Sequence, residues 1–109
     1  MPQLLVRGIS VEGTRRISGP LIRELAEICQ CGTDNFMLEC LNTVSLFEGE
    51  EVASFPFIEV AWFERGKEIR DRFAAAVTKH VQSLGVADME VAFIAYDEDK
   101  YYINGKPCK

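Results

Sequence analysis

The sequence predicts one α+β domain over residues 1–109, in which two βαβ units (about residues 2–47 and 55–103) share a four-stranded mixed sheet. Two observations predict it. The apolar pattern runs strand, helix, strand twice along the chain. The halves also look alike, because residues 2–9 and 56–63 each begin with a proline, and a turn with glycine and arginine and then a helix follow each. Right-handed connections would place both helices on one face of the sheet.

The first half begins with a strand over residues 3–9, which are rich in apolar and β-branched side chains. We expect a loop over residues 10–16 and then a helix that Ser18 caps, with a proline tolerated in its first turn. Apolar residues recur every three or four positions through this helix, and Gly32 ends it. Residues 36–47 alternate well enough to predict the second strand.

The second half follows an acidic turn at residues 48–51. Its first strand, residues 55–63, is rich in aromatic and β-branched side chains, and a helix over about residues 67–84 has apolar side chains at helical spacing. The fourth strand lies within residues 86–96. An acidic turn, a short strand at residues 101–103 and an Asn-Gly turn complete the chain.

The sheet face away from the helices is expected to be uncovered. Residues 55–63 and 86–96 form nearly continuous hydrophobic runs, so both faces of these strands should be apolar. An exposed apolar surface of that size usually marks an interface. The sequence therefore predicts self-association.

Charge and composition exclude several classes of function. The chain has a formal net charge of −5, and 48% of its residues are hydrophobic, as in globular proteins. An acidic balance argues against a nucleic-acid or anionic-membrane partner. No apolar run reaches the ~20 residues that span a bilayer, and the N-terminus lacks the pattern of a signal peptide. We expect a cytoplasmic protein.

The cysteines and the single histidine do not form a metal-binding pattern. Cys29 and Cys31 make a C-x-C pair, and no second pair answers them at a zinc spacing. His80 lies in a predicted helix without a partner histidine and is expected on its surface. We expect reduced thiols, as in cytosolic proteins, no metal site and no cofactor.

Pro2 supports a catalytic hypothesis because a strand begins directly after it. If Met1 is removed, which is usual before proline, Pro2 becomes a secondary amine held at a sheet end. An α-amino group has a pKa near ~7.7–8.0, and desolvation lowers it toward neutrality, where a base can move protons. The alternative is a proline that merely starts a strand, where its missing N–H is tolerated. With Met1 retained, Pro2 is an amide and cannot be a base.

The start Met-Pro, the order β-α-β-β-α-β and the proline beginning each half together resemble the tautomerase superfamily, which includes macrophage migration inhibitory factor and 4-oxalocrotonate tautomerase. The resemblance spans nearly the whole chain. Residues 70–96 look like the second helix and last main strand of the macrophage factor, and residues 11–27 look like the loop and first helix of the oxalocrotonate enzyme. Residues 60–71 look closest to a set of small uncharacterised bacterial members.

The resemblance implies a trimer assembled through sheet faces, with Pro2 in a pocket between subunits. Pro2 would pass a proton between the oxygen and carbon of an enol or 2-keto acid, and some relatives use the proline in hydration or dehalogenation instead. Arg15 or Arg16, after the first strand, would bind the substrate carboxylate, which suits a planar guanidinium. The chain departs from the family at Glu39, where the oxalocrotonate enzyme has an arginine, and at residues 31–34, where the macrophage factor has a lysine.

Pro2 and Arg15 are expected to lie far apart within one chain. They lie at opposite ends of the predicted first strand, and seven strand residues at ~3.3 Å each separate its ends by roughly 23 Å. Within one chain they could hardly share a ligand. A shared pocket requires a neighbouring chain, in agreement with a homo-oligomer.

Three residues of the third strand and the turn after it are further candidates. Glu59 lies mid-strand among apolar neighbours, so it is either an interface ion-pair partner or a pocket acid. Trp62 belongs to the core or a subunit contact, or walls a pocket together with Arg65. Two functions stay open: a tautomerase-like isomerase that uses Pro2 on a small carboxylate, or a non-catalytic oligomeric binding or structural protein that retains the fold.

Overall fold

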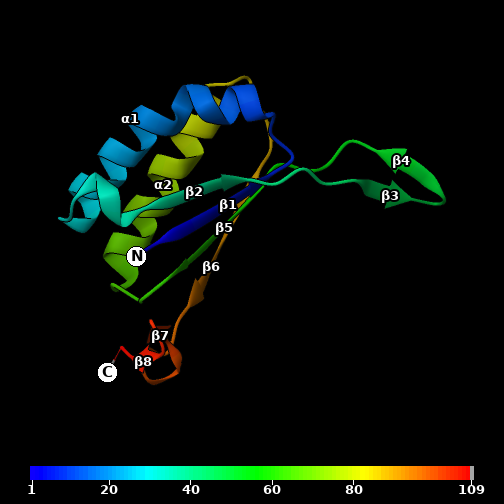
Figure 1. The fold of residues 1–109 in the computed structure, drawn as a ribbon. Helices are drawn as coiled ribbons and strands as arrows, with labels where there is room; N and C mark the ends of the chain where they lie inside the picture. Colours follow the sequence, from blue (N-terminus) through cyan, green and yellow to red (C-terminus); the bar gives the residue numbers. More distant parts are fainter. Residues whose placement is uncertain (109) are drawn as a thin grey trace.

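The structure, a computed structural model, describes residues 1–108. It confirms the predicted α+β fold, since a four-stranded sheet in the order β2-β1-β5-β6 carries both helices on one face (Figure 1). The main elements are β1 (Gln3–Arg7), α1 (Val11–Cys29), β2 (Met37–Cys40), β5 (Phe57–Trp62), α2 (Lys67–Gln82) and β6 (Glu90–Ala95). Two hairpins extend from the sheet: β3 (Ser45–Phe47) with β4 (Glu50–Val52), and β7 (Tyr102–Ile103) with β8 (Lys106–Pro107). The short 3-10 helices are η1 (Thr33–Asn35) and η2 (Glu98–Lys100).

The sheet is mixed because each half is parallel and the halves join antiparallel. β1 pairs in parallel with β2, β5 pairs in parallel with β6, and β1 meets β5 antiparallel. Each helix makes the crossover within its own parallel pair. Within residues 1–108, neither helix is long and apolar enough to cross a membrane.

The hydrophobic core lies between the helices and one face of the sheet. Strand residues alternate between the two faces, so Leu4 and Val6 of β1 are buried against the helices while Leu5 is half-buried on the other face. Apolar residues at helical spacing complete this core from above. The buried cluster consists of Leu4, Val6, Ile17, Leu21, Leu25, Ile28, Ile58, Val60, Trp62, Phe73, Ala76, Val77 and Val81.

The first helix begins earlier than predicted. Ser10 is its N-cap, and the Gly13 N–H donates to the Ser10 hydroxyl oxygen at 3.0 Å. The predicted loop over residues 10–16 and the predicted cap at Ser18 are therefore wrong, and Pro20 lies inside the helix. Ser10, three residues after the end of β1, already satisfies a free N–H group of the first turn, so no longer loop is needed.

The helix also ends earlier than Gly32, the predicted stop. Gln30 adopts the left-handed conformation (φ 53°), and its N–H donates to the Glu27 carbonyl at 3.2 Å. The Cys31 N–H donates to the Ala26 carbonyl at 3.0 Å. This pair of bonds is a Schellman motif, with glutamine at the position where glycine is usual.

A polar contact joins the two helices on their solvent side. His80 Nε2 lies 2.8 Å from a Glu24 carboxylate oxygen, and Lys79 Nζ lies 2.6 Å from the same oxygen. Hydrogen bonds from Lys79 and then His80 lower the pKa of Glu24. The prediction of a simple surface histidine is wrong, because only 16% of the His80 side chain is exposed.

The predicted strand over residues 36–47 is two strands in different sheets. β2 ends at Cys40, and β3 pairs with β4 around a turn at Glu48 and Gly49, which both have positive φ (49° and 80°). This hairpin, which we call the arm (residues 43–54), projects away from the sheet (Figure 1). Apolar and polar residues alternate through both β2 and β3, so the sequence pattern does not reveal the bend between these strands.

The open face of the sheet is only partly apolar, which corrects the expectation of an apolar surface. Leu5 lies in register with Glu39 on one side and Glu59 on the other. In the next row along the sheet, Arg7 of β1 and Glu90 of β6 lie on either side of Phe57 of β5. The apolar runs predicted this face poorly because single charged residues at alternate positions all point to it.

The C-terminal tail packs beside the sheet through aromatic rings. The predicted turn at Asn104 and Gly105 is confirmed, since both have positive φ (52° and 80°) and connect β7 to β8. Tyr101 lies 4.9 Å from Phe63 and 5.1 Å from Tyr96 between ring centroids. These rings attach the tail to the ends of β5 and β6.

Candidate functional site

Pro2 lies at the end of the sheet where β1 begins and β5 ends, which we call the proline end. The side chain of Pro2 is fully buried, and its carbonyl accepts a hydrogen bond from the Met37 N–H at 3.0 Å. Gln3 is in register with Ala61 of β5. One position further out, the antiparallel register brings Pro2 beside Trp62.

Trp62 forms the buried wall of the proline end. Its side chain is fully buried, and its ring lies 5.1 Å from Phe73 and 5.0 Å from Phe93. Its Nε1–H is buried and has no hydrogen-bond partner within residues 1–108. A buried donor left unpaired costs about 1–3 kcal/mol, so the Nε1–H of Trp62 is an unsatisfied donor in this part of the structure.

Arg65 supplies the positive charge at this end. Its guanidinium carbon lies 5.2 Å from the centroid of the Trp62 ring, and one of its N–H groups donates to the Phe63 carbonyl at 3.1 Å. Among the described residues it forms no ion pair. Its remaining N–H groups are therefore free to bind an anion, which a guanidinium does in a bidentate manner.

The end of α1 faces the same region. Burial raises the pKa of the Cys29 thiol, while the charges of Arg65 and Arg72 act in the opposite direction. Cys29 and Cys31 are both free thiols and both half-buried. Because its pKa is raised, the thiol of Cys29 stays neutral near pH 7, and its side chain packs against the hydrophobic core.

The other predicted site residues lie elsewhere in the chain. Arg15 is on α1, where it pairs with Glu12 at 3.2 Å with both side chains exposed. Arg16 is the next residue of that helix and is also exposed. Glu59 lies mid-strand on the open face, half-buried opposite Leu5. One chain thus brings together Pro2, Trp62 and Arg65, and it leaves both α1 arginines and Glu59 apart from them.

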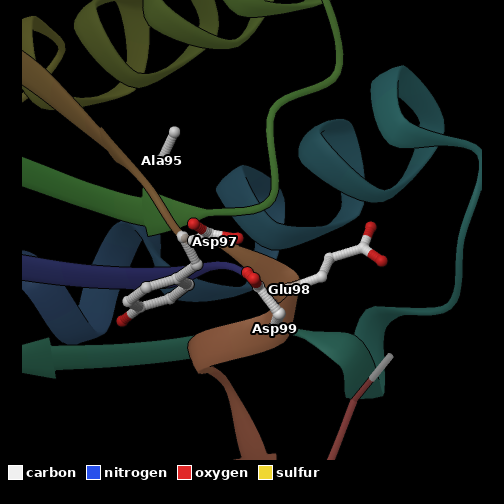
Figure 2. A pocket seen from close by; sticks show the side chains of 5 residues that line it. Ala95, Asp97, Glu98 and Asp99 are labelled. Atoms are coloured by element: carbon white, nitrogen blue, oxygen red, sulfur yellow. The ribbon is translucent and has the colours of Figure 1, made fainter.

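An acidic hollow beyond the end of β6 was not predicted as a site. Ala95, Tyr96, Asp97, Glu98 and Asp99 line this open hollow of about 750 Å³ (Figure 2). A hydrogen bond with Asp99 is the main reason that the pKa of Asp97 is raised. The sequence showed these carboxylates only as a turn. Because these carboxylates repel anions, an anionic ligand would be better accommodated beside Arg65 than in this hollow.

The model of a family described as "Domain of unknown function (DUF1904)" matches residues 1–107. The chain belongs to the DUF1904 family. A DUF1904 structure from Sebaldella termitidis is 34% identical, covers 98% of this chain and 99% of its own, and superposes with a TM-score of 0.90. A protein of unknown function from Vibrio cholerae is 28% identical, with a TM-score of 0.86 over 97% of this chain and 86% of its own.

The DUF1904 chain also shares its fold with an enzyme group. A fused 4-OT described as an asymmetric trimer superposes with a TM-score of 0.80 at 14% identity, over 97% of this chain and 95% of its own. The predicted resemblance to the tautomerase superfamily, and to its small uncharacterised members, is thereby confirmed. Identity this low shows the fold alone. No protein with a curated description matches the chain.

Proposed function

We propose that this DUF1904 chain is a tautomerase-like enzyme in which Pro2, freed of Met1, is the general base. One observation carries the proposal: Pro2, Trp62 and Arg65 of a single chain lie at one end of the sheet, and within residues 1–108 the Trp62 N–H has no hydrogen-bond partner and the Arg65 guanidinium forms no ion pair. A base, a neutral donor and a cation are the groups that proton transfer on a small carboxylic acid needs. The substrate class is a small enol, 2-keto or unsaturated acid.

The proposed proton transfer uses these three residues in separate roles. Arg65 binds the substrate carboxylate, and Trp62 donates its free N–H to a substrate oxygen. The Pro2 amine removes the proton from the enol hydroxyl, the C–O bond becomes C=O as the C=C bond becomes single, and the resulting prolinium returns a proton to the carbon of the former double bond that does not carry the oxygen. The proposal requires an unprotonated Pro2 amine near neutral pH, and nearby positive charge and burial are the two effects that lower the pKa of an amine. No cofactor takes part.

The oligomer in this proposal is a homotrimer with the pocket between subunits. The structural relative described as a fused 4-OT trimer supports it, and so does the position of Arg15 and Arg16. β1 leads away from Pro2, and both arginines follow its far end on α1. They could contact a ligand beside Pro2 only from another copy, and Glu59 would then lie on a face shared between copies. The free thiols of the four cysteines are in keeping with a cytoplasmic location.

The second candidate is a non-catalytic oligomeric binding or structural protein. Two observations favour it. The Pro2 ring is fully buried while Met1 precedes it, and the neighbouring hollow holds Asp97, Glu98 and Asp99, which repel a carboxylate. In this alternative the chain keeps Met1, and Pro2 has only a packing role.

Covalent labelling separates the two candidates. A malonate semialdehyde decarboxylase inhibited by 3-bromopropiolate shares the fold, with a TM-score of 0.65 at 18% identity, so 3-bromopropiolate is the probe. Intact mass is measured before and after treatment. The enzyme proposal expects a mass without Met1 and one adduct, which Pro2→Ala prevents. Pro56→Ala is the matched control, because Pro56 precedes β5 as Pro2 precedes β1, and it should retain the adduct. Retained Met1 with no adduct would overturn the proposal in favour of the second candidate.

A further inference from the structure

A second hollow lies where the arm joins the sheet, at the end of β1 opposite Pro2. Its volume is about 470 Å³, and its walls come from β1, β5, β6 and both ends of the arm. β1 is five residues long, and at ~3.4 Å for each residue it separates this hollow from Pro2 by roughly 17 Å. We call it the arm-base hollow. It is lined by Arg7, Thr43, Ser45, Ser54, Phe55, Phe57 and Glu90.

Arg7 brings an unpaired positive charge to the arm-base hollow. Its guanidinium carbon lies 4.6 Å from the centroid of the Phe57 ring. Within residues 1–108 Arg7 forms no ion pair. A guanidinium that lies over an aromatic ring is held there by a cation–π contact, and the N–H groups at its edge can still bind a carboxylate in a bidentate manner. Arg7 is therefore suited to hold an anionic group of a ligand.

Glu90 brings the opposite charge to the same hollow. In the register of the sheet, Phe57 of β5 lies between Arg7 of β1 and Glu90 of β6. Neighbouring strands are ~4.8 Å apart, so the Cα atoms of the two charged residues are separated by roughly 10 Å. Glu90 also forms no ion pair in the described part of the chain. The hollow thus holds two charges of opposite sign that do not neutralise each other.

Three hydroxyl groups from the two ends of the arm form a polar wall of the hollow. The Ser54 hydroxyl lies 3.0 Å from the Thr43 hydroxyl and 2.9 Å from the Ser45 hydroxyl. A hydroxyl donates one hydrogen bond and accepts up to two. The two outer hydroxyls, those of Thr43 and Ser45, therefore keep hydrogen-bonding capacity for a ligand.

Two aromatic side chains supply the apolar surface of the hollow. Phe55 is 50% exposed, and Phe57 is half-buried beneath the guanidinium. Small-molecule sites typically have volumes of ~300–1,000 Å³ and combine apolar walls with a few polar groups that fix the orientation of the ligand. The arm-base hollow has this size and this composition.

We propose that the arm-base hollow binds an α-amino acid with an apolar side chain. Arg7 binds the carboxylate of the zwitterion, and Glu90 accepts hydrogen bonds from its ammonium group. The side chain of the amino acid packs on Phe55. An acid without an ammonium group, which is the substrate class proposed for Pro2, leaves Glu90 without a partner and binds this hollow less well.

This hollow and the proline end use different residues of the chain. Arg7 and Glu90 bind the ligand of the arm-base hollow, whereas Pro2, Trp62 and Arg65 form the candidate site at the other end of the sheet. Labelling of Pro2 by 3-bromopropiolate and binding of an amino acid can therefore succeed or fail separately.

Matched ligands test the two charges one at a time. Amide chemical shifts of the native chain are followed by NMR during titration with L-leucine, with 4-methylpentanoate, which lacks the ammonium group, and with 3-methylbutylamine, which lacks the carboxylate. L-leucine is expected to bind about tenfold more tightly than either analogue, because each analogue leaves one charge of the hollow without a partner. No binding of L-leucine, or equal affinity for L-leucine and 4-methylpentanoate, would overturn the proposal.

Two variants assign the roles of the charged residues. Arg7→Gln should weaken L-leucine binding about tenfold or more, and Glu90→Gln should remove the preference for L-leucine over 4-methylpentanoate. The matched controls are Arg23→Gln on α1 and Glu68→Gln on α2, both exposed and outside the hollow, which should bind L-leucine as the native chain does. Circular dichroism checks that all four variants stay folded. Native behaviour of either Arg7→Gln or Glu90→Gln would place the ligand elsewhere and refute the proposed site.

Discussion

The body of this chain, by which we mean the four-stranded sheet with α1 and α2, buries its large apolar side chains, whereas the arm (residues 43–54) exposes side chains of the same kinds. In the body, Leu4 and Phe73 are fully buried between the helices and the sheet, whereas in the arm Leu46 and Phe47 are 69% and 66% exposed. The body completes its core within one chain. The strands of the arm pair only with each other, so its apolar residues are expected to contribute little to the folding of a single copy.

The largest expected effect is a loss of stability when a buried side chain of the body is removed. Phe73→Ala removes a fully buried ring that packs on Trp62 and Phe93, and it should lower the free energy of unfolding by ~3–5 kcal/mol. Phe47→Ala in the arm should change it by under ~0.5 kcal/mol, as for surface substitutions. Urea unfolding of both variants at a concentration that favours monomers is the measurement. Comparable losses would show that the arm belongs to the cooperative core.

The glycines of the two regions offer a second contrast. Gly8 (φ 79°) turns the chain from β1 toward α1, and a Cβ there would overlap the Phe55 carbonyl. Gly49 (φ 80°) turns the arm and has nothing near its missing side chain. Gly8→Ala therefore combines conformational strain with a steric clash and should cost ~2–4 kcal/mol, while Gly49→Ala should cost only the strain, ~1 kcal/mol. Thermal unfolding of both variants measures the difference, and equal costs would contradict the role of the Phe55 contact.

The sequence was sufficient to predict the helices and strands of the body, because the local pattern of apolar residues agrees there with the tertiary packing. Apolar spacing along α1 and α2, and β-branched and aromatic residues in β1 and β5, each predicted the element that formed. The start of α1 was misplaced because Ser10 and Ser18 are both competent caps. Only the length of the connection after β1 decides between them.

The arm and the site could not be predicted in the same way. Alternation over residues 36–47 continues through the bend, so nothing local reveals that β3 leaves the sheet. The grouping of Pro2, Trp62 and Arg65 depends on the antiparallel register of β1 and β5, which joins residues about sixty positions apart in the sequence. The candidates Arg15 and Arg16 followed from the family resemblance and Glu59 from its position in the middle of an apolar strand, and whether they contact a ligand is still a prediction.

A smaller effect on stability is expected at the contact between the two helices, where Glu24 meets Lys79 and His80. Lys79 and His80 lower the pKa of Glu24 in the folded chain. A lowered carboxyl pKa contributes stability above its unfolded value, near 4.5, and this contribution is lost as the pH falls through the folded pKa. Glu24→Gln should therefore cost at most ~1 kcal/mol at pH 7, because the pair is partly exposed. The difference from the native chain should shrink by pH 3.5 in urea unfolding. A difference independent of pH would mean that the charge of Glu24 is not involved.

The smallest expected effect concerns the end of α1, and it is a gain. Gln30 holds the left-handed position of the Schellman motif (φ 53°), where a residue with a Cβ is strained and glycine is not. Gln30→Gly should raise the free energy of unfolding by ~0.5–1 kcal/mol, and Gln30→Ala should not, because alanine keeps the Cβ. Since the backbone bonds to Glu27 and Ala26 do not involve the glutamine side chain, both variants keep the helix end. Thermal unfolding distinguishes them, and a loss of stability in Gln30→Gly would show that the glutamine side chain makes a contact worth more than the strain it imposes.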